Sequence, residues 1–262
     1  MWEQSAQHIY VAGHRGYPEK YPENTLPSFL AAIDAKVDMV ELDIRLTADH
    51  ELVVIHDASV DRTTNGIGLV KEKTLKEIKE LDAGIKKGDA FAGVGIPTFE
   101  ESLDSMKDYP GMLFNFELKE YPKDGNEKRA FETADRALKM IDAYGMSERC
   151  VINAFDATLL QYIHDTYHGR YKLHGYYPEQ YLNVTPQNRD PYTYIYCACP
   201  FDKQRSIDSY DWLRERGVQP WAGAWVSTKE DVQEAASYLT PLITCNNPGT
   251  ILAILKEMGL HP

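Results

Sequence analysis

Long apolar stretches are missing from this sequence. No run is long and apolar enough to span a bilayer, and the opening residues Met-Trp-Glu-Gln-Ser lack the basic region and the apolar run of a signal peptide. We therefore expect a cytoplasmic protein that makes no stable membrane insertion.

Cysteine is scarce, and its spacing carries no metal or disulfide signature. Cys150, Cys197, Cys199 and Cys245 show neither the pairing of a zinc site nor the dense spacing of a disulfide framework. Three of them lie in apolar runs, where we expect buried and unreactive thiols.

Positive charge is also in short supply. The chain has 28 lysines and arginines against 40 aspartates and glutamates, which gives a formal charge of −12. A chain this acidic lacks the basic footprint of a general nucleic-acid binder or anionic-membrane binder. Part of the excess acid could serve a cation, but most of it is expected to be solvated surface.

Short apolar runs alternate with helical patterns along all 262 residues. Eight runs are the expected strands: Ile9–Ala12, Met39–Ile44, Met112–Leu118, Cys150–Ala154, Lys172–Tyr176, Thr193–Ala198, Pro220–Ala224 and Leu242–Thr244. Eight strands, each followed by a helix, predict an α/β protein with a closed (β/α)8 barrel, the TIM-barrel fold, as one domain over residues 1–262. A doubly wound open sheet is the alternative.

One segment breaks this alternation. Residues 58–97 separate the second strand from a helix that is expected to begin near Thr98. The segment has a glycine-containing turn and a short helical pattern at Leu75–Leu81, and it has no low-complexity character. We interpret it as a small insertion subdomain within the barrel.

Polar residues gather where strands are expected to end. The clusters are His14-Arg15-Gly16 after strand one, Glu41-Leu42-Asp43 at the end of strand two, His56-Asp57 after the short run Leu52–Ile55, and Glu117-Leu118-Lys119 at the end of strand three. Active sites of (β/α)8 barrels lie at the carboxyl ends of the strands. All four clusters are therefore expected in one site.

Three carboxylates in these clusters indicate a metal site. Glu41 and Asp43 are two residues apart and share a strand face, which Glu117 can join from the next strand. Converging carboxylates repel unless a cation neutralises them, and oxygen ligands favour Mg²⁺ or Ca²⁺. Ordinary charges at a frayed strand end are the alternative, which their place in an apolar run disfavours.

Two histidines and two basic residues complete the candidate site. His14 and His56 can each accept or give a proton near neutral pH, which suits a phosphodiester that needs both steps. Arg15 and Lys119 supply positive charge for phosphate oxygens.

The alternative role for Arg15 is a barrel-closing salt bridge to Glu41 or Glu23, which is compatible with the first role. The other histidines are expected to be packed or surface residues: His8, His50, His164, His168, His174 and His261.

The order and approximate spacing of the motifs resemble the signature of glycerophosphodiester phosphodiesterases from Val11 to Lys119. Besides the four clusters above, the motifs are Pro22-Glu23-Asn24-Thr25, Asp61-Arg62-Thr63-Thr64, Asn65-Gly66 and Ile96-Pro97-Thr98. Any single motif is weak, whereas the set is specific.

The resemblance implies metal-dependent hydrolysis of glycerophosphodiesters to glycerol 3-phosphate and an alcohol. It implies one divalent cation, Mg²⁺ or Ca²⁺, on Glu41, Asp43 and Glu117, with His14 and His56 as the acid–base pair. It also places Arg15 and Lys119 near the phosphate. Residues expected to support the site are Glu23, Asn24 and Asp57.

The C-terminal half matches the family less well. Ala154 stands where the family often has serine, and Cys245 or Asn246 stands where it often has an acid. Phe155 and Trp225 form an apolar wall against the leaving alcohol or pack inside the barrel, and the sequence leaves both roles open. The expected partner is a small-molecule phosphodiester, and homo-oligomerisation is left open.

Two other functions compete with hydrolysis. The same scaffold hosts phospholipase D-like enzymes that make cyclic phosphates from lipids, but the chain has no disulfide framework and no clear amphipathic membrane loop. A non-catalytic binding module would have lost histidines or metal carboxylates, and none is lost.

Overall fold

Eight parallel strands form the wall of the molecule in a computed structural model that describes residues 8–123, 125–183, 189–201 and 205–262. The strands are β1 Tyr10–Gly13, β2 Met39–Leu46, β4 Leu113–Leu118, β5 Cys150–Asn153, β6 Lys172–Tyr177, β7 Cys197–Pro200, β8 Gln219–Pro220 and β9 Leu242–Cys245. They are hydrogen-bonded in the order β8-β7-β6-β5-β4-β2-β1-β9. A parallel bridge between Ala222 and Ile243 joins the two ends of this order, which closes the wall.

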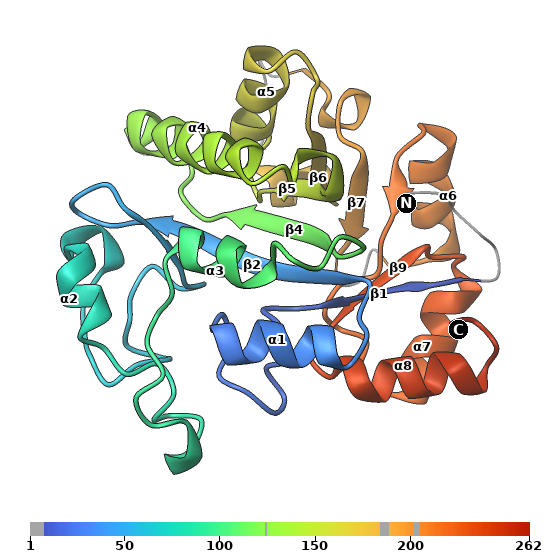
Figure 1. The fold of residues 1–262 in the computed structure, drawn as a ribbon. Helices are drawn as coiled ribbons and strands as arrows, with labels where there is room; N and C mark the ends of the chain where they lie inside the picture. Colours follow the sequence, from blue (N-terminus) through green and yellow to red (C-terminus); the bar gives the residue numbers. More distant parts are fainter. Residues whose placement is uncertain (1–7, 124, 184–188, 202–204) are drawn as a thin grey trace.

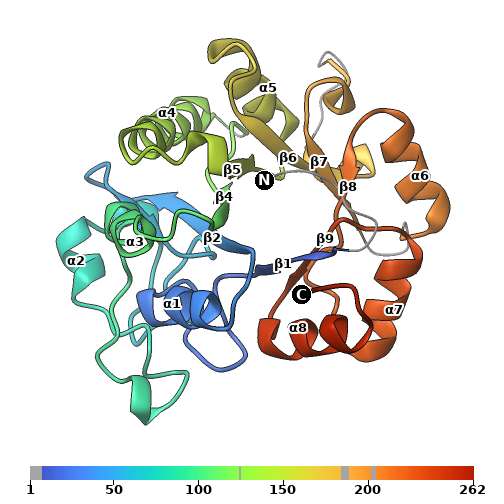
Figure 2. The same ribbon diagram turned by 45° about the vertical axis from the view of Figure 1, so that its right-hand side comes forward.

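The helices pack around the outside of the strands (Figures 1 and 2). They are α1 Leu26–Asp34, α2 Leu75–Lys79, α3 Phe99–Met106, α4 Glu127–Ala143, α5 Ala157–Thr166, α6 Ile207–Glu215, α7 Lys229–Ser237 and α8 Pro248–Glu257. Short 3₁₀ turns are η1 Val70–Glu72, η2 Asp89–Phe91, η3 Ser147–Arg149, η4 Glu179–Leu182 and η5 Pro191–Thr193. The prediction of a closed (β/α)8 barrel is confirmed, and the open sheet is excluded.

Local sequence explains how several elements begin. Thr98 and Glu101 form a capping box at the start of α3, and Thr228 and Asp231 form the predicted one at the start of α7. Seven of the eight residues of β2 are buried, as expected for a parallel strand that is covered on both faces. All four cysteines are buried free thiols.

Three predicted strand boundaries were wrong. β2 continues to Leu46 because the antiparallel strand β3, Leu52–Val54, pairs with its last residues, so Glu41 and Asp43 lie inside the strand and not at its end. The run predicted from Thr193 begins with the last residue of turn η5. Strand β8 is only Gln219–Pro220, so Pro220 alone of the run predicted over Pro220–Ala224 lies in that strand.

Residues 58–97 project from one side of the barrel, at the lower left of Figure 1. This segment contains η1, α2 and η2, and it shares an apolar cluster with the end of β3 that is separate from the barrel core. The members of that cluster are Val53, Ile55, Val60, Val70, Ile78, Ala83 and Ile96. A cluster of its own supports the proposal that this segment is an inserted subdomain.

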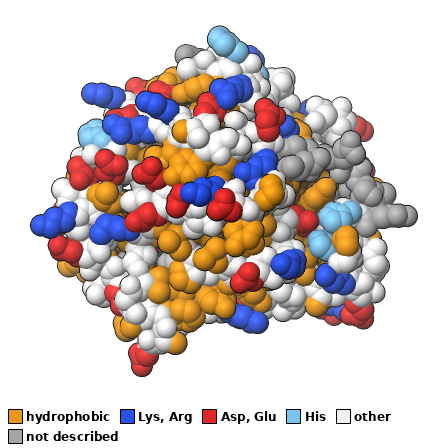
Figure 3. All heavy atoms as spheres, in the orientation of Figure 1, with side chains coloured by type: hydrophobic (Ala, Val, Ile, Leu, Met, Phe, Trp, Pro, Cys, Tyr) orange, Lys and Arg blue, Asp and Glu red, His pale blue; other side chains and the backbone are white. Residues whose placement is uncertain are grey.

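The face shown in Figure 3 is of mixed charge. On the face shown in Figure 3, Lys and Arg side chains lie among Asp and Glu side chains. Among the described residues, no helix combines the length and the apolar character needed to cross a bilayer.

Candidate active site

A cavity of about 310 Å³ lies at the carboxyl ends of the barrel strands. Eight of the predicted site residues line it: His14, Arg15, Glu41, His56, Glu117, Lys119, Phe155 and Trp225. Of the four other predicted residues, Glu23 and Asp43 contact Arg15, Asp57 contacts His56, and Asn24 contacts Asp43. The structure therefore brings all twelve residues into one region.

The three predicted metal carboxylates converge. Glu41 and Asp43 come from β2, and Glu117 is the register partner of Asp43 on β4. Their oxygens lie within 4.8 Å of one another, and all three residues are buried. Burial and the neighbouring negative charges raise the pKa of Glu41 well above its usual value. Burial likewise raises the pKa of Glu117.

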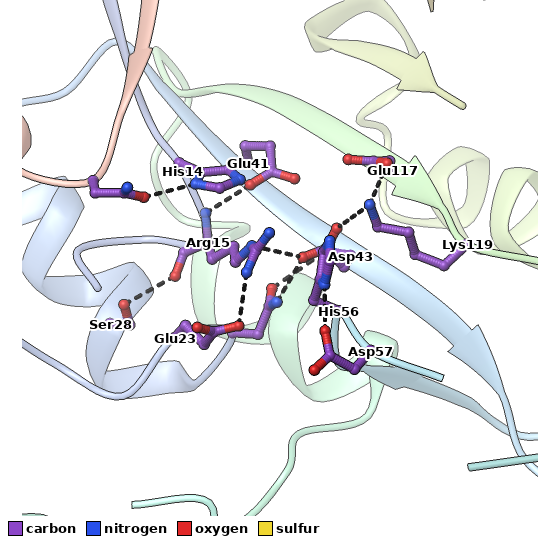
Figure 4. A network of polar contacts seen from close by, with 12 residues as sticks. His14, Arg15, Glu23, Ser28, Glu41, Asp43, His56, Asp57, Glu117 and Lys119 are labelled. Atoms are coloured by element: carbon purple, nitrogen blue, oxygen red, sulfur yellow. Dashed lines mark hydrogen bonds and ion pairs between the residues drawn. The ribbon is translucent and has the colours of Figure 1, made fainter. Parts of the chain in front are cut away.

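Two positively charged side chains, Lys119 and Arg15, face this carboxylate cluster (Figure 4). Lys119 Nζ lies 3.1 Å from Asp43 Oδ1 and also contacts Glu117, and Arg15 Nε lies 3.3 Å from Asp43 Oδ2. Burial alone would raise the pKa of Asp43, but Lys119 and Arg15 outweigh burial and lower it. Asn24 holds the same carboxylate with an amide hydrogen bond of 2.7 Å.

The donor set suits a hard divalent cation. Glu41 Oε2 accepts the backbone N–H of Arg15 at 2.6 Å, while its buried Oε1 has no hydrogen-bond partner in the part of the chain that the structure describes. Three carboxylates face only two cations, and Arg15 is shared with Glu23 at 2.9 Å. Glu41 Oε1 is thus a free oxygen ligand, and ionisation of all three carboxylates would leave negative charge for a cation to neutralise, which fits Mg²⁺ or Ca²⁺.

His14 directly follows β1, and a neutral partner holds its ring in place. Its Nδ1 lies 2.7 Å from Oδ1 of Asn246, which follows β9. Burial, and next the charge of Arg15, lowers the pKa of His14 to about 4. The imidazole is therefore neutral at pH 7, and its second nitrogen is available to accept a proton.

His56 has a charged partner. Its Nδ1 lies 2.6 Å from Asp57 Oδ1, and Arg62 Nε donates to Asp57 Oδ2 at 2.6 Å. Arg62 also donates to both carboxylate oxygens of Glu23, at 2.7 and 2.8 Å. The hydrogen bond from Arg62 lowers the pKa of Asp57 to about 2, and burial lowers the pKa of His56.

Arg62 links the inserted segment to the strand-one loop, because it joins Asp57 to Glu23, which in turn holds Arg15. Arg62 belongs to the motif Asp61-Arg62-Thr63-Thr64, but the sequence alone indicated no role for it. Arg62 and its partner Glu23 are 39 residues apart in the sequence, so only the motif that contains Arg62 could have indicated a role for this arginine.

A further part of the cavity wall is aromatic. The ring of Phe155 stacks on Tyr176 with centroids 3.4 Å apart, and Lys119 Nζ lies 5.6 Å from the same ring. The guanidinium of Arg205 lies 4.3 Å from the Trp225 ring. Phe155 and Trp225 thus face the cavity and also pack against neighbours, while sequence reasoning missed Tyr176 and Arg205.

Comparisons with known proteins point in one direction. A family model described as "Glycerophosphoryl diester phosphodiesterase family" matches residues 14–199. A "Glycerophosphodiester phosphodiesterase" of Caldanaerobacter subterraneus subsp. tengcongensis is 35% identical over an alignment of 255 residues that covers 95% of this chain and 98% of that protein.

Solved structures show the same fold. A phosphodiesterase from Oleispira antarctica in complex with the product sn-glycerol-3-phosphate has a TM-score of 0.82 at 24% identity, covering 97% of this chain and 100% of that chain. A glycerophosphodiester phosphodiesterase from Agrobacterium tumefaciens has a TM-score of 0.75 at 22% identity, covering 94% and 99%.

Proposed function

The chain belongs to the glycerophosphoryl diester phosphodiesterase family and is an enzyme of that activity, and we propose that it works by metal-dependent histidine acid–base catalysis. The observation that carries this proposal is the convergence of His14, His56 and three buried carboxylates on one cavity. The proposed products are glycerol 3-phosphate and an alcohol.

Each group has a proposed task. A divalent cation held by Glu41, Asp43 and Glu117 would, when bound, neutralise negative charge on the phosphate and stabilise the charge that builds up during displacement. Arg15 and Lys119 lie against the same carboxylates and can share the phosphate oxygens.

We assign proton transfer to the imidazoles of His14 and His56. One imidazole takes a proton from water as the water oxygen forms its bond to phosphorus. The other, protonated, gives a proton to the alcohol oxygen as that P–O bond breaks. Asn246 and Asp57 orient the two rings, since each bonds the Nδ1 atom and leaves Nε2 for the reaction.

The proposed substrates are small and water-soluble. The Oleispira relative was solved with sn-glycerol-3-phosphate, and we infer that the same group occupies the cavity here. Phe155 and Trp225 line the space left for the alcohol. A cavity of about 310 Å³ accommodates a glycerophosphodiester more readily than a diacyl lipid.

A substrate panel tests this proposal. We expect hydrolysis of glycerophosphocholine, glycerophosphoethanolamine, glycerophosphoglycerol or glycerophosphoinositol with Mg²⁺ or Ca²⁺, and little with vesicle phospholipid. Phosphorus NMR of the products separates an open phosphate monoester from a cyclic phosphate. A preference for intact vesicle lipid, or a cyclic phosphate as the final product, would contradict the proposal.

A further inference from the structure

Three side chains able to bind a metal meet at the opposite end of the barrel from the cavity. His8 precedes β1, Asp38 precedes β2, and His261 follows α8. Since β1 and β2 run in parallel toward the cavity, residues that precede them lie at the amino ends of the strands. One ligand atom from each of the three lies within 4.8 Å of the others. We expected these histidines to be unrelated packed or surface residues, and the fold brings them together.

The spacing is that of metal ligands. His261 Nε2 lies 3.1 Å from Asp38 Oδ2, and His8 Nε2 lies 3.6 Å from Asp38 Oδ1. A separation of 3.6 Å is too long for a hydrogen bond. Zinc–nitrogen bonds of about 2.0–2.1 Å in a tetrahedron place neighbouring ligands roughly 3.3 Å apart. Both separations are close to that value, although they are measured to different oxygens of Asp38 and the shorter one also allows a hydrogen bond.

The ligands are oriented in advance. The backbone N–H of Val11 donates to Asp38 Oδ2 at 2.8 Å, which fixes the carboxylate. The two imidazole rings lie 4.7 Å apart, and each turns its Nε2 toward that carboxylate. His8 Nε2 is buried and has no hydrogen-bond partner among the described residues. A buried nitrogen with no such partner is the kind of group that a metal satisfies.

We propose that His8, Asp38 and His261 form a second metal site, which takes a transition-metal cation of the Zn²⁺ type. Imidazole nitrogens favour Zn²⁺, whereas the all-oxygen cluster in the cavity favours Mg²⁺ or Ca²⁺. Three protein ligands leave a fourth position for water.

Bound metal would tie the start of β1 to the segment after α8. Because these ligands come from distant parts of the chain and bind together only in the folded state, the metal stabilises that state. The site contains none of the residues that line the cavity, so its proposed role is structural.

Zinc titration of the whole, metal-stripped chain tests the proposal. Excess Mg²⁺ keeps the cavity carboxylates occupied while Zn²⁺ is added, and calorimetry and thermal unfolding are followed. We expect one tightly bound Zn²⁺ and a rise in Tm. Loss of an outer-shell partner typically costs about 10–100-fold in metal affinity, so His8→Ala and His261→Ala should cost more and abolish the Tm rise. Both variants should hydrolyse diesters with Mg²⁺ at the wild-type rate.

His50→Ala is the matched control. His50 also pairs with a carboxylate, at 2.9 Å from Glu132, but no third metal-binding side chain of the described residues joins this pair. This variant should bind Zn²⁺ like the wild type. Equal Zn²⁺ binding by His8→Ala, His261→Ala and wild type would overturn the proposal, and so would absence of binding by wild type.

A second readout does not depend on the variants folding. In the wild type, Zn²⁺ should shift the imidazole NMR signals of His8 and His261 and leave that of His50 in place. Zinc that perturbs neither His8 nor His261 would overturn the assignment.

Discussion

His14 and His56 differ in their partners although both line one cavity. The first is bonded to the neutral amide of Asn246, and the second to the carboxylate of Asp57, which Arg62 holds in its ionised form. A carboxylate partner favours the imidazolium more than an amide does. The two rings are therefore suited to opposite proton transfers.

Removing either imidazole should slow the reaction with little effect on the fold. Loss of one acid–base partner typically lowers the rate by about 10²–10⁴-fold, and we expect this for His14→Ala and for His56→Ala on a natural diester. Initial rates at saturating metal, with circular dichroism as the control for folding, measure the effect. Near-normal rates for both variants would refute the acid–base assignment.

A nitrophenyl phosphodiester assigns the two roles. Its leaving group needs little help from an acid, so it should restore the rate of the variant that lost the acid and not of the variant that lost the base. Restoration of both variants, or of neither, would contradict a division of roles between the two histidines.

Activity should persist at pH values below the usual pKa of a histidine side chain. Burial lowers the pKa of His14 to about 4 and lowers that of His56 as well. A lowered pKa means that the neutral imidazole persists as the pH falls below about 6.5, the usual histidine value. We expect a bell-shaped kcat/KM profile whose acid limb has its midpoint below that value. A midpoint above pH 7 would contradict the buried environment described for the two rings.

The sequence motifs predicted residues that the fold brings together, and the roles of these residues remain predictions. All twelve predicted site residues meet in or beside the cavity. Arg62, Asn246 and Arg205 were given no role, because their contacts depend on how distant segments fold together. The hydrogen bond from Asn246 to His14, for example, joins residues 232 positions apart.

At the scale of elements, the turn after β1 determines where His14 and Arg15 point. Arg15 and Gly16 have φ of 55° and 86°, in the left-handed region. A Cβ on Gly16 would lie 2.6 Å from the backbone carbon of Ser28 and 2.7 Å from its oxygen. Ser28 belongs to α1, so the turn and the helix can pack together only with glycine at this position.

Gly16→Ala should therefore destabilise the protein and impair the site. Strain of this kind typically costs about 1–3 kcal/mol in the free energy of unfolding, to which the clash with Ser28 adds. Urea denaturation measures the change. Gly111→Ala is the matched control, because open space surrounds that glycine, and it should stay within about 1 kcal/mol of wild type. Equal stability of the two variants would contradict this view of the turn.

The strand predictions succeeded where a buried run was uninterrupted, as in β4 and β5, and failed where local turn chemistry competed. Residues 193–196 are of types that favour β-strands. Nevertheless, Asp190 accepts a hydrogen bond from Tyr192 N–H at 2.9 Å and starts the 3₁₀ turn η5. Strand β7 therefore begins only at Cys197. The extension of β2 depends on its pairing with β3, which periodicity within β2 could not reveal.

At the scale of the whole molecule, barrel closure joins two unequal halves of a site. Strands β1, β2 and β4 and their loops carry the carboxylates and most of the other charged groups, while Phe155, Tyr176, Trp225 and the charged Arg205 come from the later half of the barrel. The family signature is concentrated in the first half. The charged groups of the candidate site were therefore predictable from sequence, whereas the shape of the aromatic wall required the fold.

We propose that a cation at the carboxylate cluster is required for hydrolysis. The most direct test of this proposal is the rate of glycerophosphodiester hydrolysis as Mg²⁺ or Ca²⁺ is removed with a chelator and restored, in wild type and in Glu41→Gln. Glu120→Gln is the control, because Glu120 is also buried but pairs with Arg45 and Arg129 outside the cluster. We predict that chelation abolishes the wild-type rate, that added metal restores it, and that only Glu41→Gln needs a higher metal concentration and stays slow. A full wild-type rate in excess chelator would contradict the account.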